Sequence, residues 1–185
     1  DHCYRVGEQG LLVHNASAGQ VAYGSTDLSA LAQSVRKSTR NYSNRNLAIF
    51  EYRDGKALKT VCAFSRGNRG YTRNLGHSER RIAEWLERNG IQACNVTRIY
   101  SEFAPCTVIS CDKFVSSTFP QAKVTWSFEY GDRDALEDAR GGSEEEMEEA
   151  KELDQESRDI GKSEFQEAIK NLRNATIAST NLRCI

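Results

Sequence analysis

A chain of 185 residues is long enough for one well-packed domain with an appendage, and it is too short for two large domains. No stretch approaches the roughly 20 apolar residues that span a bilayer, so we expect no membrane partner. No segment has the basic, apolar and small-residue order of a signal peptide.

The charges are unevenly distributed along the chain. Residues 17–131 hold 16 Lys and Arg against 9 Asp and Glu, whereas residues 132–185 hold 8 against 15. A basic body followed by an acidic tail is typical of a polyanion-binding domain with a separate, solvated element. The alternative is that the tail is only the charged surface of a helix.

The first half of the chain predicts two hairpins with a helix between them. Thr26 or Asp27 can cap the helix, and an Asp54-Gly55 turn joins the strands of the second hairpin. In chain order, the predicted elements are a hairpin at 2–16, a linker at 17–26, a helix at 26–38 and a hairpin with strands at 47–52 and 58–64.

The second half predicts alternating helices and strands, followed by an acidic tail. The elements are a glycine-rich loop at 66–76, a helix at 77–90, a strand at 93–103, a helix at 111–119 and a strand at 123–131. Capping-box patterns at Ser143 and Ser163 predict two helices in the tail. The order indicates the α/β class, with a mixed β-sheet and helices packed on it.

Six cysteines are scattered along the chain, too sparsely for a small disulfide scaffold. They are Cys3, Cys62, Cys94, Cys106, Cys111 and Cys184. We therefore expect a reducing destination, with some thiols used as metal ligands.

His77 is the one histidine of the body, and Glu79 follows it at the start of the predicted helix. Pro105-Cys106 ends the next strand, and Cys111 follows after four residues. Residues five apart on a regular helix differ by about 140°, so both sulfurs can be ligands only if Cys106 belongs to the strand end and Cys111 to the first helical turn. Taken separately, the same residues are also compatible with a surface helix start, buried core thiols or a disulfide.

A His, two Cys and a nearby Glu that is not a ligand are what zinc-assisted deamination requires. Three protein ligands leave the fourth zinc position to a water, whose pKa the metal lowers. The glutamate then moves protons from that water to the ring nitrogen and the leaving ammonia. The His-x-Glu and Pro-Cys…Cys pattern is the signature of zinc-dependent base deaminases.

The segments GHSERRIAEWL, YSEFAPC with a second Cys four residues on, and VTWSFEYG resemble the bacterial toxin branch of the cytidine deaminase-like superfamily. The resemblance covers about residues 46–131. It implies a cytidine deaminase-like α/β/α sandwich, with Zn²⁺ bound by His77, Cys106 and Cys111 and with Glu79 as proton shuttle. The four-residue gap between the cysteines departs from the commoner gap of two.

The segment YRVGEQGLLVHNA is similar to the end of a Hint (intein-like) autoprocessing domain, in which a terminal His-Asn pair cleaves the chain. By that resemblance, His14 and Asn15 mark a cleavage point. The expected organisation is a Hint remnant at 1–16, a zinc-dependent deaminase domain at 17–133 and an acidic helical extension at 134–185.

The basic body and the arginine-rich loop before His77 favour a nucleic acid as substrate, since arginines hold phosphates and aromatic rings stack on bases. The expected substrate is cytosine in nucleic acid, with single-stranded DNA favoured; cytosine rather than adenine is implied by the resemblance alone. The candidate substrate contacts are Asn46, Arg69, Tyr71, Arg73 and Glu102.

The resemblance also implies a secreted or delivered bacterial effector that acts in the target-cell cytoplasm, with an immunity protein in the producing cell. Two alternatives stay open. The chain is either a deaminase of free nucleosides or nucleotides, or a non-catalytic, zinc-stabilised module that binds nucleic acid. In the latter, Glu79 would be dispensable and Cys106 would be needed for folding.

Overall fold

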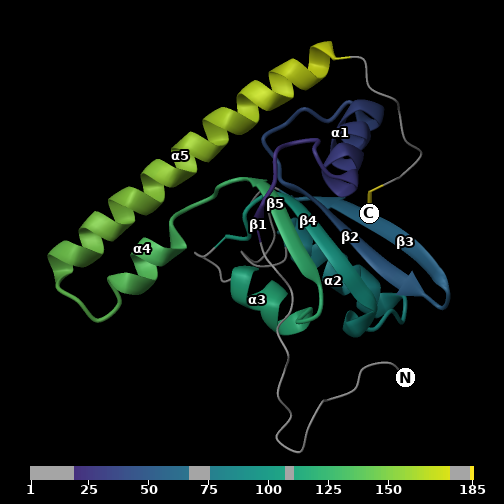
Figure 1. Cartoon of the computed structure of the whole chain (residues 1–185), viewed down its shortest axis with the longest axis horizontal. Coiled ribbons are helices and arrows are strands. Elements are labelled where there is room, and N and C mark those ends of the chain that lie inside the picture. Colours follow the sequence, from purple (N-terminus) through teal and green to yellow (C-terminus); the bar gives the residue numbers. More distant parts are fainter. Residues whose placement is uncertain (1–18, 67–75, 107–110, 176–183) are drawn as a thin grey trace, which may run out of the picture.

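The computed structural model describes residues 19–66, 76–106, 111–175 and 184–185. Figure 1 shows a central sheet with helices on both of its faces and one long helix running across the molecule. The elements are β1 (Gly19–Gln20), α1 (Asp27–Thr39), β2 (Leu47–Asp54), β3 (Ala57–Phe64), α2 (Ser78–Arg88), a 3-10 turn (Ala93–Asn95), β4 (Val96–Phe103), α3 (Cys111–Thr118), β5 (Lys123–Phe128), α4 (Arg133–Asp138) and α5 (Glu144–Asn174).

The five strands form one mixed sheet in the order β1-β5-β4-β2-β3. β2 pairs antiparallel with both β3 and β4, while β5 lies parallel to β4 and to β1. The hairpin expected around Asp54-Gly55 is confirmed. The segment 17–26, which was expected to be only a linker, contributes the short strand β1 to the sheet edge.

Helices cover both faces of the sheet, because the central strands alternate apolar residues between two cores. On β2, Leu47 and Ile49 pack with α1, whereas Ala48 and Phe50 pack with α2 and α3 on the opposite face. Thr26 caps α1 in a capping box, as the sequence predicts. The α/β fold with a mixed sheet, helices on both faces and a C-terminal helix is therefore confirmed.

Within the acidic tail, residues 144–174 form one continuous helix, α5, where the sequence predicted two. The capping box at Ser143 is present and starts α5. Ser163, the expected second start, lies inside the same helix. Gly161 and Phe165, on either side of Ser163, are both buried against the body of the protein, and this packing carries the helix through Ser163, so a capping-box pattern by itself does not start a new helix.

α5 belongs to the packed core of the protein. Phe165, Ile169 and Leu172 lie on one face of the helix and are buried against Phe103 and Phe128, at the ends of β4 and β5. Figure 1 shows α5 lying diagonally beside this end of the sheet. The domain boundary expected between residues 133 and 134 stays a prediction. Among the described helices, none is long and apolar enough to cross a membrane.

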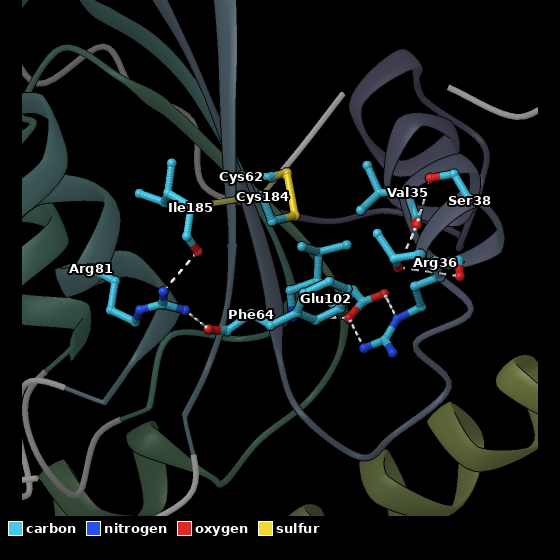
Figure 2. The surroundings of a disulfide bond; sticks show 11 residues. Val35, Arg36, Ser38, Cys62, Phe64, Arg81, Glu102, Cys184 and Ile185 are labelled. Carbon is cyan, nitrogen blue, oxygen red and sulfur yellow. Dashed lines mark hydrogen bonds and ion pairs between the residues drawn. A yellow bond between two sulfur atoms is a disulfide. The ribbon is translucent and has the colours of Figure 1, made fainter. Parts of the chain in front are cut away.

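A disulfide joins Cys62 of β3 to Cys184 (Figure 2). The neighbouring Ile185 donates its N–H to the carbonyl oxygen of Cys62 and accepts a hydrogen bond of 2.7 Å from Arg81 of α2. The expectation that the cysteines stay reduced is thus wrong for this pair. Two cysteines separated by 122 residues give no local sequence pattern that would have shown the pairing.

Replacing Cys184 with serine is expected to lower the free energy of unfolding by about 2–5 kcal/mol, because the cross-link restricts a long loop of the unfolded chain. Urea-induced unfolding followed by circular dichroism measures this loss. A variant within 1 kcal/mol of the wild type, roughly the scale of an ordinary point mutation, would show that the disulfide contributes little to stability.

Candidate metal and catalytic site

His77, Cys106 and Cys111 come from three different parts of the fold and meet at one point. His77 is the N-cap residue of α2, Cys106 follows the end of β4, and Cys111 is the first residue of α3. The backbone N–H of Cys111 donates to the carbonyl oxygen of Cys106 at 2.9 Å, which holds the two cysteines close together. The predicted placement of the two sulfurs, one after the strand and one in the first helical turn, is confirmed.

These three side chains form a group that could hold a metal ion, the one such group among the described residues. Their ligand atoms all lie within 4.8 Å of one another. The Nδ1 of His77 is 3.4 Å from the Sγ of Cys111 and 3.8 Å from the Sγ of Cys106. Both cysteines are buried, and in the described part of the chain they are the two free thiols.

The electrostatics of the group fit a bound cation. The hydrogen bond that the ring N–H of His77 donates to the Cys106 sulfur raises the pKa of His77, against the opposing effect of burial. The pKa of Cys111 is also raised, by its hydrogen bond with Cys106, by burial and by the charge of Glu79. A positive metal ion would reverse this crowding of negative groups, since thiols that coordinate a metal lose their protons. One imidazole and two thiolates form a soft ligand set that suits zinc.

Glu79 lies next to this group, in the first turn of α2, and is almost fully buried. Ser101 of β4 donates its hydroxyl to Oε1 of Glu79 at 2.9 Å, and Ser78 donates to Oε2 at 3.0 Å. Hydrogen bonds to both oxygens fix the orientation of the carboxylate.

Asn46, the residue before β2, holds these two serines in turn. Its amide nitrogen lies 2.9 Å from the oxygen of Ser78, 2.8 Å from that of Ser101 and 3.1 Å from Oε1 of Glu79. An amide has two N–H donors, and the two serine oxygens are the nearest acceptors, so each serine accepts from Asn46 and donates to Glu79. The amide oxygen accepts from the N–H of Phe103 at 3.1 Å, which fixes the assignment of the two ends of the amide.

The site opens into a cavity of about 200 Å³. Its lining comprises Asn44, Asn46, Ser65, Arg66, His77, Glu79, Phe103, Ala104, Cys106 and Tyr130. A larger hollow of about 690 Å³ lies between α2 and α3, with a mostly apolar lining that includes Phe114 and Phe119. The larger hollow is lined by none of the three candidate ligands, whereas His77 and Cys106 both line the smaller cavity.

Glu102, expected as a substrate contact, lies on the opposite face of the sheet from Glu79. It is fully buried, and its carboxylate forms an ion pair with Arg36 of α1 at 2.6 Å (Figure 2). Neighbouring residues of a strand point to opposite faces, so Ser101 faces the site and Glu102 cannot. The expectation of a substrate contact is therefore corrected. Glu102 instead pairs with Arg36, whose guanidinium donates to backbone carbonyl oxygens of the segment that leads to Asn46.

The other expected contacts are placed only in part. Asn46 does line the cavity, and it is also hydrogen-bonded to the network around Glu79. Arg69, Tyr71, Arg73, His14 and Asn15 lie outside the described residues. Arg66 and Gly76, which flank one undescribed segment, meet at the cavity, with the N–H of Arg66 2.7 Å from the carbonyl oxygen of Gly76.

Sequence reasoning missed Ser78, Ser101 and Tyr130. Strand alternation would have found Ser101, because Ile99 and Phe103 lie on the same face of β4. Tyr130 was expected inside a strand at 123–131, but β5 ends at Phe128, so strand alternation does not give the direction of this side chain.

A three-layer α/β fold with a His/Cys/Cys group and a glutamate at the start of a helix is the arrangement of zinc-dependent base deaminases. A family model described as Xanthomonas-like deaminase matches residues 43–149, which include all four of these residues. The chain belongs to this deaminase family. None of the curated proteins matches the chain.

Proposed function

We propose that the protein is a zinc-dependent hydrolytic deaminase that converts cytosine to uracil in nucleic acid, with single-stranded DNA as the favoured substrate. The observation that carries the proposal is that His77, Cys106 and Glu79 line one cavity, with Cys111 beside them, in a member of a deaminase family. When bound, zinc supplies Lewis-acid chemistry, because it lowers the pKa of a coordinated water.

The protein's own residues would orient the reactants and move the protons. The carboxylate of Glu79 takes a proton from the attacking water and delivers protons to the ring nitrogen and to the departing ammonia. Ser78, Ser101 and Asn46 keep that carboxylate in one orientation while it changes partners. The burial of Glu79 excludes bulk water from the transfer.

Arg66 at the cavity rim and the excess of basic residues in the body support a polyanionic substrate. Arginine side chains near an open cavity can hold the phosphates that flank a target base. Arg69, Tyr71 and Arg73 are proposed to extend this contact.

The test is to incubate the zinc-loaded protein separately with single-stranded DNA, duplex DNA, RNA and free cytidine, and to assay each for uracil. Uracil is expected to form fastest in the single-stranded DNA. Conversion of free cytidine to uridine, with no uracil formed in the three nucleic acids, would identify a nucleoside deaminase, and no conversion in any of the four would refute the proposal.

Zinc is expected to bind at one ion per chain, because three ligands converge on one point. Changing Cys106 or Cys111 to serine should remove most of the zinc, measured by elemental analysis after gel filtration. Cys184→Ser is the matched control, since this cysteine lies in the disulfide and not in the group. Full zinc content in the Cys111→Ser variant would rule out the assigned ligand set.

The proposal includes action as an exported bacterial toxin. Its support is the Cys62–Cys184 disulfide, because disulfides persist in oxidising compartments and are rare in the cytosol. Such a toxin would act in the cytoplasm of the target cell, and its producer would need an immunity protein that covers the cavity.

A further inference from the structure

Residues 129–132, the segment after β5, contact α5 one after another. Gly161 brings the backbone of the helix directly against the backbone of Glu129, and a Cβ at this position would overlap the carbonyl oxygen of Glu129. Gly161 is buried within a continuous helix, where glycine is otherwise disfavoured. The close approach explains why a glycine occupies this position.

One turn earlier in α5, the guanidinium of Arg158 lies over the ring of Tyr130, 5.0 Å from its centroid. Another turn earlier, Asp154 accepts a hydrogen bond of 3.0 Å from the N–H of Asp132. Gly131, between Tyr130 and Asp132, has a φ of +103°, and a Cβ there would overlap the carboxylate of Asp154. Residues 129–132 are thus shaped to fit against one face of α5.

Arg158 and Asp154 form a two-point ion pair, with Nε–Oδ2 and Nη2–Oδ1 distances of 2.8 and 3.1 Å. Their side chains are only 11% and 12% exposed, whereas those of the Lys162–Asp159 pair on the same helix are 44% and 64% exposed. Burial lowers the pKa of Arg158, but the hydrogen bond and charge of Asp154 outweigh it and raise the pKa. The guanidinium is therefore charged and held in one orientation over Tyr130.

Tyr130 connects the contacts with α5 to the candidate site, because it lines the cavity together with His77 and Glu79. Its ring also packs against Phe103, with the centroids 5.4 Å apart. Phe103 lies at the end of β4, three residues before Cys106. The ring is thus sandwiched between the body of the deaminase and α5.

We propose that Arg158 is a positioning residue for the substrate cavity: it fixes Tyr130 as the aromatic wall of the cavity, which makes α5 an integral part of the deaminase. This inference rests on the proposed function for the nature of the ligand. Its structural part, that α5 orders residues 129–132, does not depend on the reaction.

The test is a double-mutant cycle of Arg158→Ala and Tyr130→Ala, read as KM and kcat for the deamination of a single-stranded oligonucleotide. Each single change should raise KM about tenfold with little change in kcat, since contact with an aromatic ring contributes to base binding. Arg158→Ala should add nothing in the Tyr130→Ala background, because Arg158 acts through Tyr130. Arg158→Lys, which keeps the charge beside Asp154, should restore part of the loss.

A merely structural role of Arg158 would give a different result. Loss of folded protein lowers the apparent kcat and leaves KM unchanged, and additive effects of Arg158→Ala and Tyr130→Ala on KM would likewise overturn the proposal. Lys162→Ala, which removes an exposed pair from the same helix, is the matched control and should behave as the wild type.

Hydrogen exchange separates this inference from the proposed function. In Arg158→Ala, the amide of Asp132 should exchange at least about tenfold faster than in the wild type. Its acceptor, Asp154, no longer has the two hydrogen bonds from Arg158 that hold it in place. If no substrate is deaminated, the proposed function fails while faster exchange still supports the positioning by α5. Unchanged exchange overturns that positioning whatever the activity.

Discussion

Replacing Glu79 with glutamine is expected to reduce cytosine deamination by at least about 10²–10⁴-fold, because an amide cannot carry the proton that general acid–base catalysis moves. Glutamine keeps the size of the side chain and one carbonyl oxygen, which can still accept from Ser101 or Ser78. Folding and zinc content should therefore stay as in the wild type. The measurement is the initial rate of uracil formation, together with thermal unfolding and zinc analysis of the same preparation.

Glu84→Gln provides the matched control for this experiment. Glu84 lies on the same helix, but it pairs with Arg88 at the surface and does not line the site cavity. Full activity in Glu84→Gln with none in Glu79→Gln assigns the proton transfer to Glu79. Wild-type activity in Glu79→Gln would refute the catalytic role of Glu79. If the wild-type protein binds zinc but deaminates no substrate, the non-catalytic module that binds nucleic acid is favoured.

The three candidate ligands could be located from sequence because each lies at a boundary that local rules predict. His77 precedes the apolar stripe of a helix, Cys106 follows a strand, and Cys111 starts the next helix. Boundaries of this kind depend on caps and periodicity within a few residues. Their convergence on one point followed from the chemistry of the residue types, and the structure bears it out.

Longer-range features had no such local signal. The disulfide between Cys62 and Cys184 joins residues 122 positions apart, which periodicity cannot connect. The acidic composition of α5 indicated a solvated element, although Phe165, Ile169 and Leu172 follow helical spacing and are buried, together with Gly161. A glycine in a charged helix carries no evident meaning until the backbone of Glu129 is found against it.

Glu102 was expected as a substrate contact, but its carboxylate faces away from the cavity. Besides Arg36, the hydroxyl of Tyr23 and the N–H of Leu47 donate to it. Burial raises the pKa of Tyr23, and the charge of Glu102 adds to the effect. Tyr23 thus stays protonated as a donor to the carboxylate.

Replacing Arg36 with methionine is expected to lower the free energy of unfolding by about 3–5 kcal/mol, because Glu102 is left buried without its counter-charge. Both partners of this ion pair are fully buried. The guanidinium also donates to the carbonyl oxygens of Asn41, Ser43 and Arg45, at 2.7, 3.1 and 2.6 Å. Its loss therefore releases the segment that leads to Asn46. Urea-induced unfolding measures the stability.

The double variant Arg36→Met/Glu102→Leu separates the effect of the unpaired Glu102 carboxylate from the effect of releasing the segment that leads to Asn46. Apolar replacement of a whole buried ion pair is often close to neutral in stability, so removing the stranded carboxylate should recover part of the lost free energy. The recovery is expected to be incomplete, since the three carbonyl oxygens, the Tyr23 hydroxyl and the Leu47 N–H still lack their partner. Deamination by the double variant should remain below that of the wild type even where it is fully folded, because Asn46 is no longer held in line with Glu79. Wild-type activity in a folded double variant would confine the ion pair to a role in stability alone.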